Sequence, residues 1–371
     1  MRVLVLNPGS ATLKATVLDP PGQEPTFERL VEWAGDATAA DRRQAVDLVV
    51  RSMADAGIAS DSIGAVGYRV VHGGTRFTEP VALDDATVEA IDELAHLAPL
   101  HNPVAASTIR AARPTFPAVK HVAVFDTAFH AVLPEAGYRY PVPDSWGREH
   151  GIRRYGFHGL SVAWSTRRAA ELLERPADRL RIVVAHLGGG CSVTAVDGGR
   201  SVDTSMGLTP LEGLMMGTRA GSIDPGIIFR LLRDGVAAAE IEHDLERASG
   251  LLGVAGTDDM RTLLADEPSG DERAALAIEL FVRRAAAGIA AAATVLPSLD
   301  AVVFTGGIGE NAEPIRRRIC ERLSVLGVPV PAAGDGEDSV LASRMSGVAV
   351  LRVRAREDVV IADETERVAG G

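Results

Sequence analysis

The stretch VLVLNPGSATLKATVL, residues 3–18, sets the pattern for the fold. An apolar run ends at Asn7-Pro8-Gly9-Ser10, and an alternation of apolar and polar residues resumes at Leu13. Apolar runs and period-two alternation are typical of β-strands, and a short turn between them predicts a hairpin. The stretch VVAHLGGGCSVTAVDGG, residues 183–199, repeats this design near the middle of the chain. Each hairpin therefore opens one half of the sequence.

Strands and helices alternate along the rest of the chain. This order, with hairpins at the start of each half, predicts an α/β fold with mixed sheets. A length of 371 residues favours two domains. We expect strands at 3–6, 13–18, 65–71, 121–125, 182–186, 192–196 and 301–305. We expect helices at 41–56, 85–96, 161–173, 225–232, 271–295 and 313–323. The proline- and aromatic-rich segment after His130 shows no clear period and is the expected domain boundary.

The bulk composition excludes several classes of protein. A net charge of −12 argues against nonspecific binding to nucleic acid or to anionic membranes. The two cysteines, Cys191 and Cys320, form no CxxC motif, which indicates a reducing cytoplasm. The apolar run at 3–6 is too short for a signal peptide, and the Ala-rich run at 285–296 is too short for a membrane span.

Three turns rich in small residues are suited to holding an anion. In the first turn, Ser10, Thr12 and Lys14 alternate and so face one side. The second turn, residues 188–190, offers nearly bare backbone, and a third, residues 306–309, follows a strand and precedes a helix. Backbone N–H groups, hydroxyls and a lysine are donors for phosphate, so the three turns together favour a nucleotide site. The chain contains neither a P-loop motif nor a GxGxxG motif at its first strand–helix junction.

Three proline-marked positions predict helix starts. Asn102-Pro103, Thr209-Pro210 and Asp224-Pro225 each place a capping residue before a proline, and Thr209 with Glu212 fits a capping box. Between the second and third starts, Arg219 lies in a short loop flanked by glycines.

Several segments, read in order, resemble one family. They are NPGSATLK, YRVVHGG, APLHNP, VFDTAFH, RRYGFHG, AHLGGGCSV, VDTSMGLTPLEGLMMGTRAGSIDPG and FTGGIGEN. This pattern strongly resembles the acetate kinase family, part of the superfamily of sugar kinases, heat-shock-70 ATPases and actin. The resemblance implies two duplicated actin-like (ribonuclease H-like) α/β domains with mixed sheets and an active-site cleft between them. The implied domains are residues 1–130, with 359–371 returning to them, and residues 131–358, which bind the nucleotide.

The resemblance implies reversible, direct in-line transfer of the γ-phosphoryl group of ATP to acetate, giving acetyl phosphate and ADP. The implied catalytic residues are Arg69, Asp126, His158 and Arg219. Arginine suits this chemistry because its planar donors match both carboxylate and phosphate. A true base is not expected, because acetate is already ionised at neutral pH.

Further site residues follow from the same resemblance. The cofactor is Mg²⁺, with Mn²⁺ as a possible substitute, and Asn7 and Glu357 are the implied metal-site residues. The implied acyl pocket is Val71, Leu100, Phe157 and Pro210. The implied nucleotide-binding residues are Ser10, Thr12, Lys14, His186, Leu187, Gly188, Gly189, Gly190, Asp259, Met260, Arg261, Gly306, Gly307, Ile308 and Gly309. The implied partners are acetate and ATP, without nucleic acid or membrane, in a cytoplasmic homodimer.

Two of these residues depart from the family pattern, and Thr12, in place of the usual serine, keeps the hydroxyl. Position 189 is Gly where the family usually has Asn, which removes an amide expected near the phosphates and leaves the phosphoryl donor open. Two alternatives to acetate kinase stay open: a propionate- or butyrate-type acyl kinase, and a noncatalytic nucleotide-binding protein of the actin-like superfamily.

Overall fold

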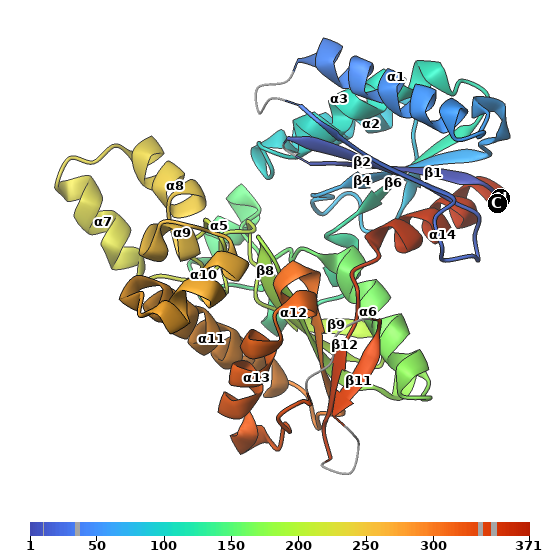
Figure 1. The fold of residues 1–371 in the computed structure, drawn as a ribbon. Helices are drawn as coiled ribbons and strands as arrows, with labels where there is room; N and C mark the ends of the chain where they lie inside the picture. Colours follow the sequence, from blue (N-terminus) through green and yellow to red (C-terminus); the bar gives the residue numbers. More distant parts are fainter. Residues whose placement is uncertain (10, 34–37, 333–336, 343–346) are drawn as a thin grey trace. The chain divides into compact units, whose positions relative to one another are not determined.

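The computed structural model describes residues 1–9, 11–33, 38–332, 337–342 and 347–371. The chain divides into two compact units. Figure 1 colours the chain by position along the sequence, so the residues of each unit can be followed there. Unit 1 comprises residues 1–131 and 356–371, and unit 2 comprises residues 132–355. The C-terminal segment thus returns three residues before the expected position 359, and this assigns Glu357 to unit 1.

Unit 1 contains a six-stranded sheet in the order β3-β2-β1-β4-β6-β5. Its strands are β1 (Val3–Pro8), β2 (Thr12–Leu18), β3 (Phe27–Glu32), β4 (Ala65–Val70), β5 (Val81–Ala82) and β6 (Lys120–Phe125). Its helices are α1 (Ala39–Asp55), α2 (Asp85–Glu93), α3 (Asn102–Ala112) and α14 (Glu357–Gly370). Strands β1, β4 and β6 are parallel, and β2, β3 and β5 run antiparallel to their neighbours.

Helices cover both faces of this sheet (Figure 1). The core on the α1–α3 face contains Leu13, Ala15 and Val17, the alternate residues of β2. The last helix, α14, packs against β1, β4 and β6 on the other face. A Cβ on Gly67 would lie 2.2 Å from Oγ1 of Thr365, so glycine at this position allows α14 to approach β4.

Unit 2 repeats the same sheet. Its strand order, β9-β8-β7-β10-β12-β11, has the same sequence of parallel and antiparallel pairings as the sheet of unit 1. The strands are β7 (Arg181–Leu187), β8 (Cys191–Asp197), β9 (Arg200–Thr204), β10 (Ala301–Thr305), β11 (Ser339–Ala342) and β12 (Ala349–Arg352). The shared order confirms the expectation of two duplicated α/β domains with mixed sheets.

The described residues of unit 2 form more helices than those of unit 1. They are α4 (Glu135–Tyr138), α5 (Asp144–His150), α6 (Gly159–Leu172), α7 (Pro225–Arg233), α8 (Ala238–Arg247), α9 (Gly250–Ala255), α10 (Met260–Asp266), α11 (Glu272–Ala293), α12 (Gly306–Asn311) and α13 (Glu313–Arg322). Helix α11 packs against β7 and β8, and α6 packs against β7 and β10. None of the helices formed by described residues combines the length and the apolar character that crossing a bilayer requires.

The sequence patterns predicted about half of these strands and helices. Every strand and helix expected from periodicity is present, including both hairpins. Asp224 caps α7 by accepting a hydrogen bond from the amide of Gly226 at 2.9 Å. Strands β3, β5, β9, β11 and β12 were not expected. The segment after His130, interpreted as irregular, contains the short helices α4 and α5.

Two predicted helix starts are wrong in detail. No helix begins at Thr209-Pro210, because the side chain of Glu212 is bound by Tyr140 and Arg154 instead of returning to a helix cap. Asn102 is the first helical residue of α3 rather than its cap, and its buried side chain donates to the carbonyl of His72 at 2.9 Å. The glycine turn at 306–309 is the first turn of α12.

Candidate active site

Arg69 and Asp126 form a buried ion pair in unit 1. They lie at the ends of the adjacent parallel strands β4 and β6, where the two strands reach the same edge of the sheet. Nε of Arg69 donates to Oδ2 of Asp126 at 3.1 Å, and Nη2 donates to the same oxygen. The side chain of Asp126 is only 1% exposed and that of Arg69 is 19% exposed. Two predicted catalytic residues are therefore in direct contact.

The environment of Asp126 is unusual for a carboxylate. Burial raises its pKa to about 6, with Arg69 opposing the shift and Glu357 adding to it. Burial disfavours the charge of Arg69, but Asp126 and Glu357 outweigh this effect, and the pKa of Arg69 is raised. The second oxygen of Asp126, Oδ1, is buried and has no hydrogen-bond partner. It is therefore an acceptor open to a ligand, a water molecule or a metal ion.

Asn7 and Glu357 complete this cluster. Asn7 lies in β1, and Glu357 is the first residue of α14. Oδ1 of Asn7 accepts from Nη1 of Arg69 at 3.3 Å, and Nδ2 of Asn7 lies 3.5 Å from Oε2 of Glu357, which is also 3.5 Å from Nε of Arg69. Arg69 thus joins three oxygen-bearing side chains drawn from three different elements.

The oxygen donors of this cluster fit a magnesium site with few protein ligands. Mg²⁺ usually keeps several waters and binds one or two carboxylates. Asp126, with its unpartnered oxygen, and Glu357 supply carboxylates, and Asn7 supplies an amide oxygen. Among the described residues no group of three or more His, Cys, Asp or Glu side chains forms a richer metal site.

The first turn is only partly described. Ser10, one of its predicted phosphate-binding residues, lies outside the described residues. Thr12 begins β2 and its carbonyl accepts from the amide of Gly9 at 2.7 Å. Lys14 is paired across the hairpin with Asn7 and so lies on the same face of the sheet. Its Nζ lies 3.1 Å from Oε2 of Glu28 in an exposed ion pair, which contributes little to stability.

The four predicted acyl-pocket residues belong to different units. Val71 and Leu100 are in unit 1, where Val71 is buried and Leu100 is 40% exposed. Phe157 and Pro210 are in unit 2, where Phe157 is buried. Neither unit by itself contains the whole set.

His158 has a strained backbone in unit 2. Its φ of 58° and ψ of 22° lie in the left-handed region immediately before α6. Such conformations cost about 1–3 kcal/mol in non-glycine residues and cluster at functional sites. Nδ1 of His158 lies 3.0 Å from Oγ of Ser192 in β8, and its ring stacks on that of His186 with centroids 4.1 Å apart. His186 Nδ1 lies in turn 2.9 Å from Oγ of Ser161.

His158 and Arg219 converge on Gly190. A Cβ built on Gly190 would lie 3.3 Å from Nε2 of His158 and 3.6 Å from Nη1 of Arg219. Nη1 of Arg219 also donates to the carbonyl of Pro210 at 3.3 Å. Burial lowers the pKa of Arg219, although the group stays cationic at neutral pH. Two predicted catalytic side chains thus present nitrogen atoms beside one glycine of the second turn.

A cavity of about 400 Å³ adjoins this glycine turn. Seven predicted nucleotide-binding residues line it: Gly188, Gly189, Asp259, Met260, Arg261, Gly307 and Ile308. The turns at 188–190 and 306–309 are packed together, since a Cβ on Gly306 would lie 2.8 Å from the carbonyl oxygen of Leu187. His186, Leu187, Gly190, Gly306 and Gly309 are not part of the lining.

The cavity also has lining residues that the sequence did not suggest. These are Asp258, Leu264, Asn311 and Ala312. Asn311 ends α12, and its Nδ2 donates to the carbonyl of Gly307 at 2.9 Å. The signal that could have revealed it is its spacing of four residues from Gly307, which is one helical turn. Asp259 caps α10 and binds the exposed guanidinium of Arg261.

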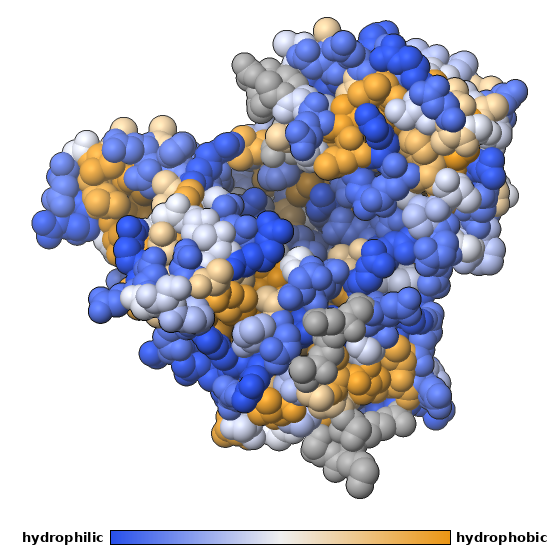
Figure 2. Space-filling model, viewed as in Figure 1, coloured by the Kyte–Doolittle hydropathy of each residue, from blue (hydrophilic) through white to orange (hydrophobic). Residues whose placement is uncertain are grey.

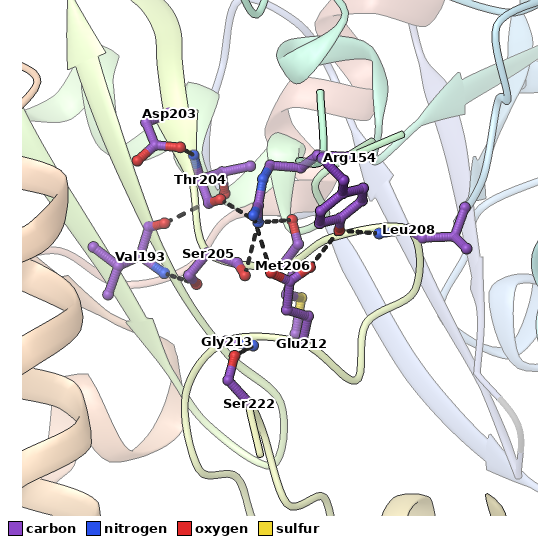
Figure 3. Close-up of polar contacts among 11 residues, drawn as sticks. Arg154, Val193, Asp203, Thr204, Ser205, Met206, Leu208, Glu212, Gly213 and Ser222 are labelled. Atoms are coloured by element: carbon purple, nitrogen blue, oxygen red, sulfur yellow. Dashed lines mark hydrogen bonds and ion pairs between the residues drawn. The ribbon is translucent and has the colours of Figure 1, made fainter. Parts of the chain in front are cut away.

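A polar network around Arg154 was missed by sequence reasoning (Figure 3). Nη2 of Arg154 donates to Oε1 of Glu212 at 3.0 Å, and the hydroxyl of Tyr140 donates to Oε2 of the same carboxylate. Nη1 of Arg154 donates to three successive carbonyls, those of Thr204 (2.8 Å), Ser205 (3.0 Å) and Met206 (3.2 Å). Arg154 is part of the RRYGFHG motif that contains His158, but no local pattern indicates partners about 50 positions away.

The repeated sheet topology and the glycine-lined cavity define a protein of the actin-like superfamily, a class of duplicated α/β proteins. The sequence model of the acetokinase family matches residues 2–363, and the chain belongs to this family, whose members are kinases that phosphorylate a carboxylate.

Individual relatives agree with this assignment. An acetate kinase from Deinococcus radiodurans is 44% identical over an alignment 395 positions long, which covers 100% of this chain and 99% of that protein. The crystal structure of an acetate kinase from Porphyromonas gingivalis superimposes with a TM-score of 0.89 at 33% identity, and covers 99% of both chains. A propionate kinase from Francisella tularensis superimposes with the same TM-score of 0.89 at 36% identity, again over 99% of both chains.

Proposed function

We propose that the protein is an acetate kinase that uses ATP. A carboxylate oxygen of acetate attacks the γ-phosphorus of ATP and forms a P–O bond. The bond between that phosphorus and the oxygen of the β-phosphate breaks, and its electron pair stays on ADP. The products are acetyl phosphate and ADP, and no proton is transferred. The observation that carries the proposal is the convergence of His158 and Arg219 beside Gly190, next to the glycine-lined cavity.

The proposed roles follow from charge. Phosphoryl transfer depends on positioning and on neutralising charge spread over the phosphoryl oxygens. His158 and Arg219 are placed to bind the oxygens of the moving phosphoryl group, and the cavity holds the adenosine part of the nucleotide. Arg69 binds the acetate carboxylate, and Asp126 fixes the orientation of its guanidinium through two hydrogen bonds to one oxygen.

We further propose that Asn7, Asp126 and Glu357 hold Mg²⁺ with the help of bound waters. When bound, the ion would offset the negative charge of the ATP phosphates. The buried, unpartnered Oδ1 of Asp126 supports this site.

The acyl specificity is proposed to favour acetate, with propionate as a slower substrate. Val71 is the residue that limits the pocket in this proposal, and it is buried. One added methylene is worth only about 1–3 kcal/mol of discrimination, so the preference is expected to be incomplete. The similarity to a propionate kinase at 36% identity makes propionate the second candidate substrate.

The assembly is proposed to be a cytoplasmic homodimer. Helix α7 exposes Ile227, Phe229 and Leu232, which are 48%, 60% and 43% exposed. Figure 2 shows hydrophobic surface over this helix. Apolar patches of this kind mark interaction surfaces. Both cysteines are buried free thiols, in keeping with a reducing compartment.

One experiment tests the proposed function. Purified protein is incubated with ATP, Mg²⁺ and acids of two to four carbons, and acyl phosphate is trapped with hydroxylamine. We expect acetyl hydroxamate to form fastest. Folded protein that yields no hydroxamate with any of these acids would refute the kinase assignment, and faster reaction with propionate would reassign the substrate.

A further inference from the structure

The segment between β9 and α7 is held by side chains rather than by regular structure. Residues 205–224 contain no helix or strand. Backbone groups in an irregular buried segment need other partners, because unpaired polar groups are costly. The guanidinium of Arg154 supplies one nitrogen to three consecutive carbonyls, and its other terminal nitrogen reaches Glu212 further along the segment (Figure 3).

Tyr140 completes the network by binding two residues of the segment. Its hydroxyl accepts from the amide of Leu208 at 3.0 Å and donates to Glu212. Gly207 lies directly against this contact, since a Cβ there would fall 1.8 Å from Oε2 of Glu212 and 2.0 Å from the tyrosine oxygen. Only glycine fits at position 207 while the hydrogen bond between Tyr140 and Glu212 is kept.

The segment fixed in this way carries the carbonyl that binds Arg219. Pro210 lies between Leu208 and Glu212, both of which are held by the network, and its carbonyl accepts from Nη1 of Arg219 at 3.3 Å. The base of the loop is closed by two hydrogen bonds between Gly213 and Ser222, at 2.9 and 3.0 Å. The position of the Arg219 guanidinium beside Gly190 therefore depends on where the network places Pro210.

We propose that Arg154, together with Glu212 and Tyr140, positions Arg219 for phosphoryl transfer. In this role Arg154 is a positioning residue that acts through the carbonyl of Pro210. The inference rests on the proposed kinase function for its effect on rate. A displacement of about 1 Å in a positioned group can cost on the order of 10²-fold in rate.

The test compares Arg154→Lys with a matched control. Lysine keeps the positive charge but cannot reach the three carbonyls and Glu212 together. Arg153→Lys is the same change one residue away, where the guanidinium lies over the ring of Tyr138 at 3.9 Å. We expect Arg154→Lys to lower kcat on the order of 10²-fold, with KM for ATP within about twofold of wild type. We expect Arg153→Lys to stay within about threefold of wild-type activity.

A double-mutant cycle distinguishes the positioning of Arg219 by Arg154 from a nonspecific effect of the substitution on the structure. If Arg154 acts through Arg219, adding Arg154→Lys to Arg219→Ala lowers kcat by less than about threefold. If Arg154→Lys lowered kcat as much in the Arg219→Ala protein as in the wild-type protein, the proposal would be overturned. Tyr140→Phe serves as a second, milder variant if Arg154→Lys does not fold, with the same non-additivity expected.

Amide hydrogen exchange tests the network without any assay of activity. Exchange in peptides covering residues 205–212 and 216–221 is expected to accelerate at least tenfold in Arg154→Lys and not in Arg153→Lys. Unchanged exchange in these peptides would contradict the positioning role even if activity fell. If the wild-type protein formed no acyl phosphate, the kinase proposal would fail, while the exchange data would still decide whether the network holds the Arg219 loop.

Discussion

His158 and Ser192 are joined by a hydrogen bond, with Nδ1 of the imidazole 3.0 Å from the buried Oγ. This bond fixes the ring so that Nε2 faces Gly190. Ser192→Ala should therefore lower kcat roughly tenfold, which corresponds to about 1.4 kcal/mol, the loss of one buried hydrogen bond. Steady-state kinetics measures this loss. Ser165→Ala is the control, because the buried hydroxyl of Ser165 has no hydrogen-bond partner. Equal activity in both variants would show that Ser192 does not position His158 for the reaction.

Gly190 and Gly189 provide a matched pair of substitutions. A Cβ at position 190 would enter the space beside His158 and Arg219, whereas a Cβ at position 189 meets no atom within 4 Å. Gly190→Ala is expected to reduce kcat at least tenfold, by obstructing the moving phosphoryl group. Gly189→Ala should retain most activity. The same assay on both variants checks this, and similar losses in the two would show that the space beside Gly190 has no special role.

Arg219→Ala should reduce turnover on the order of 10³-fold, as expected of an arginine that stabilises charge in phosphoryl transfer. The control is Arg230→Ala in α7, where the guanidinium forms an exposed pair with Asp234. Kinetics and a thermal melt are measured on both proteins. A loss below tenfold in folded Arg219→Ala would mean that this arginine does not act in the reaction.

We expect Asp126 to give the reaction a pH dependence. The ionised carboxylate holds Arg69, and its pKa is raised to about 6 by burial. Activity at saturating substrate should fall as pH drops below about 6, because protonation weakens the pair. The pH–rate profile of Asp126→Asn should lack this step. A step of the same midpoint in the variant would assign the titration to another group.

The same group is expected to make stability depend on pH in the opposite direction, so that stability falls as pH rises. Its folded-state pKa of about 6 lies above the ordinary value of 3.8, so the folded protein binds a proton more tightly than the unfolded chain. Between these two values, the free energy of unfolding should decrease as pH rises, relative to Asp126→Asn. Urea titrations of both proteins from pH 4 to pH 7 measure the difference. A wild-type advantage that grows with pH would contradict the raised pKa.

The sequence predicted the parts of the fold that follow local rules. The hairpins at 3–18 and 183–199 have clear alternation, and Asp224-Pro225 is a capped helix start that α7 uses. The short edge strands β5 and β11 were missed because they pair at only a few positions, and their residues have no strong pattern.

The residues of the candidate site could be predicted where a sequence motif contains them. Arg69, Asp126, His158 and Arg219 came from the family resemblance, and the structure brings the first two together in unit 1 and the last two together in unit 2. Two further features depend on tertiary contacts, so no local pattern could reveal them. They are the left-handed backbone of His158 and the hydrogen bonds from Arg154 to residues 204–212. The incorrect helix start at Thr209 has the same origin, because Tyr140 and Arg154 together bind the Glu212 carboxylate that the predicted capping box required.

In the proposed reaction, an oxygen of acetate attacks the γ-phosphorus of ATP. The direct measurement uses acetate labelled with ¹⁸O in the carboxylate, with the products resolved by phosphorus NMR and mass spectrometry. We predict that ¹⁸O appears in the oxygen joining carbon to phosphorus in acetyl phosphate, with unlabelled ADP as the other product. Label recovered in AMP, or ATP left unreacted by the folded protein, would contradict it.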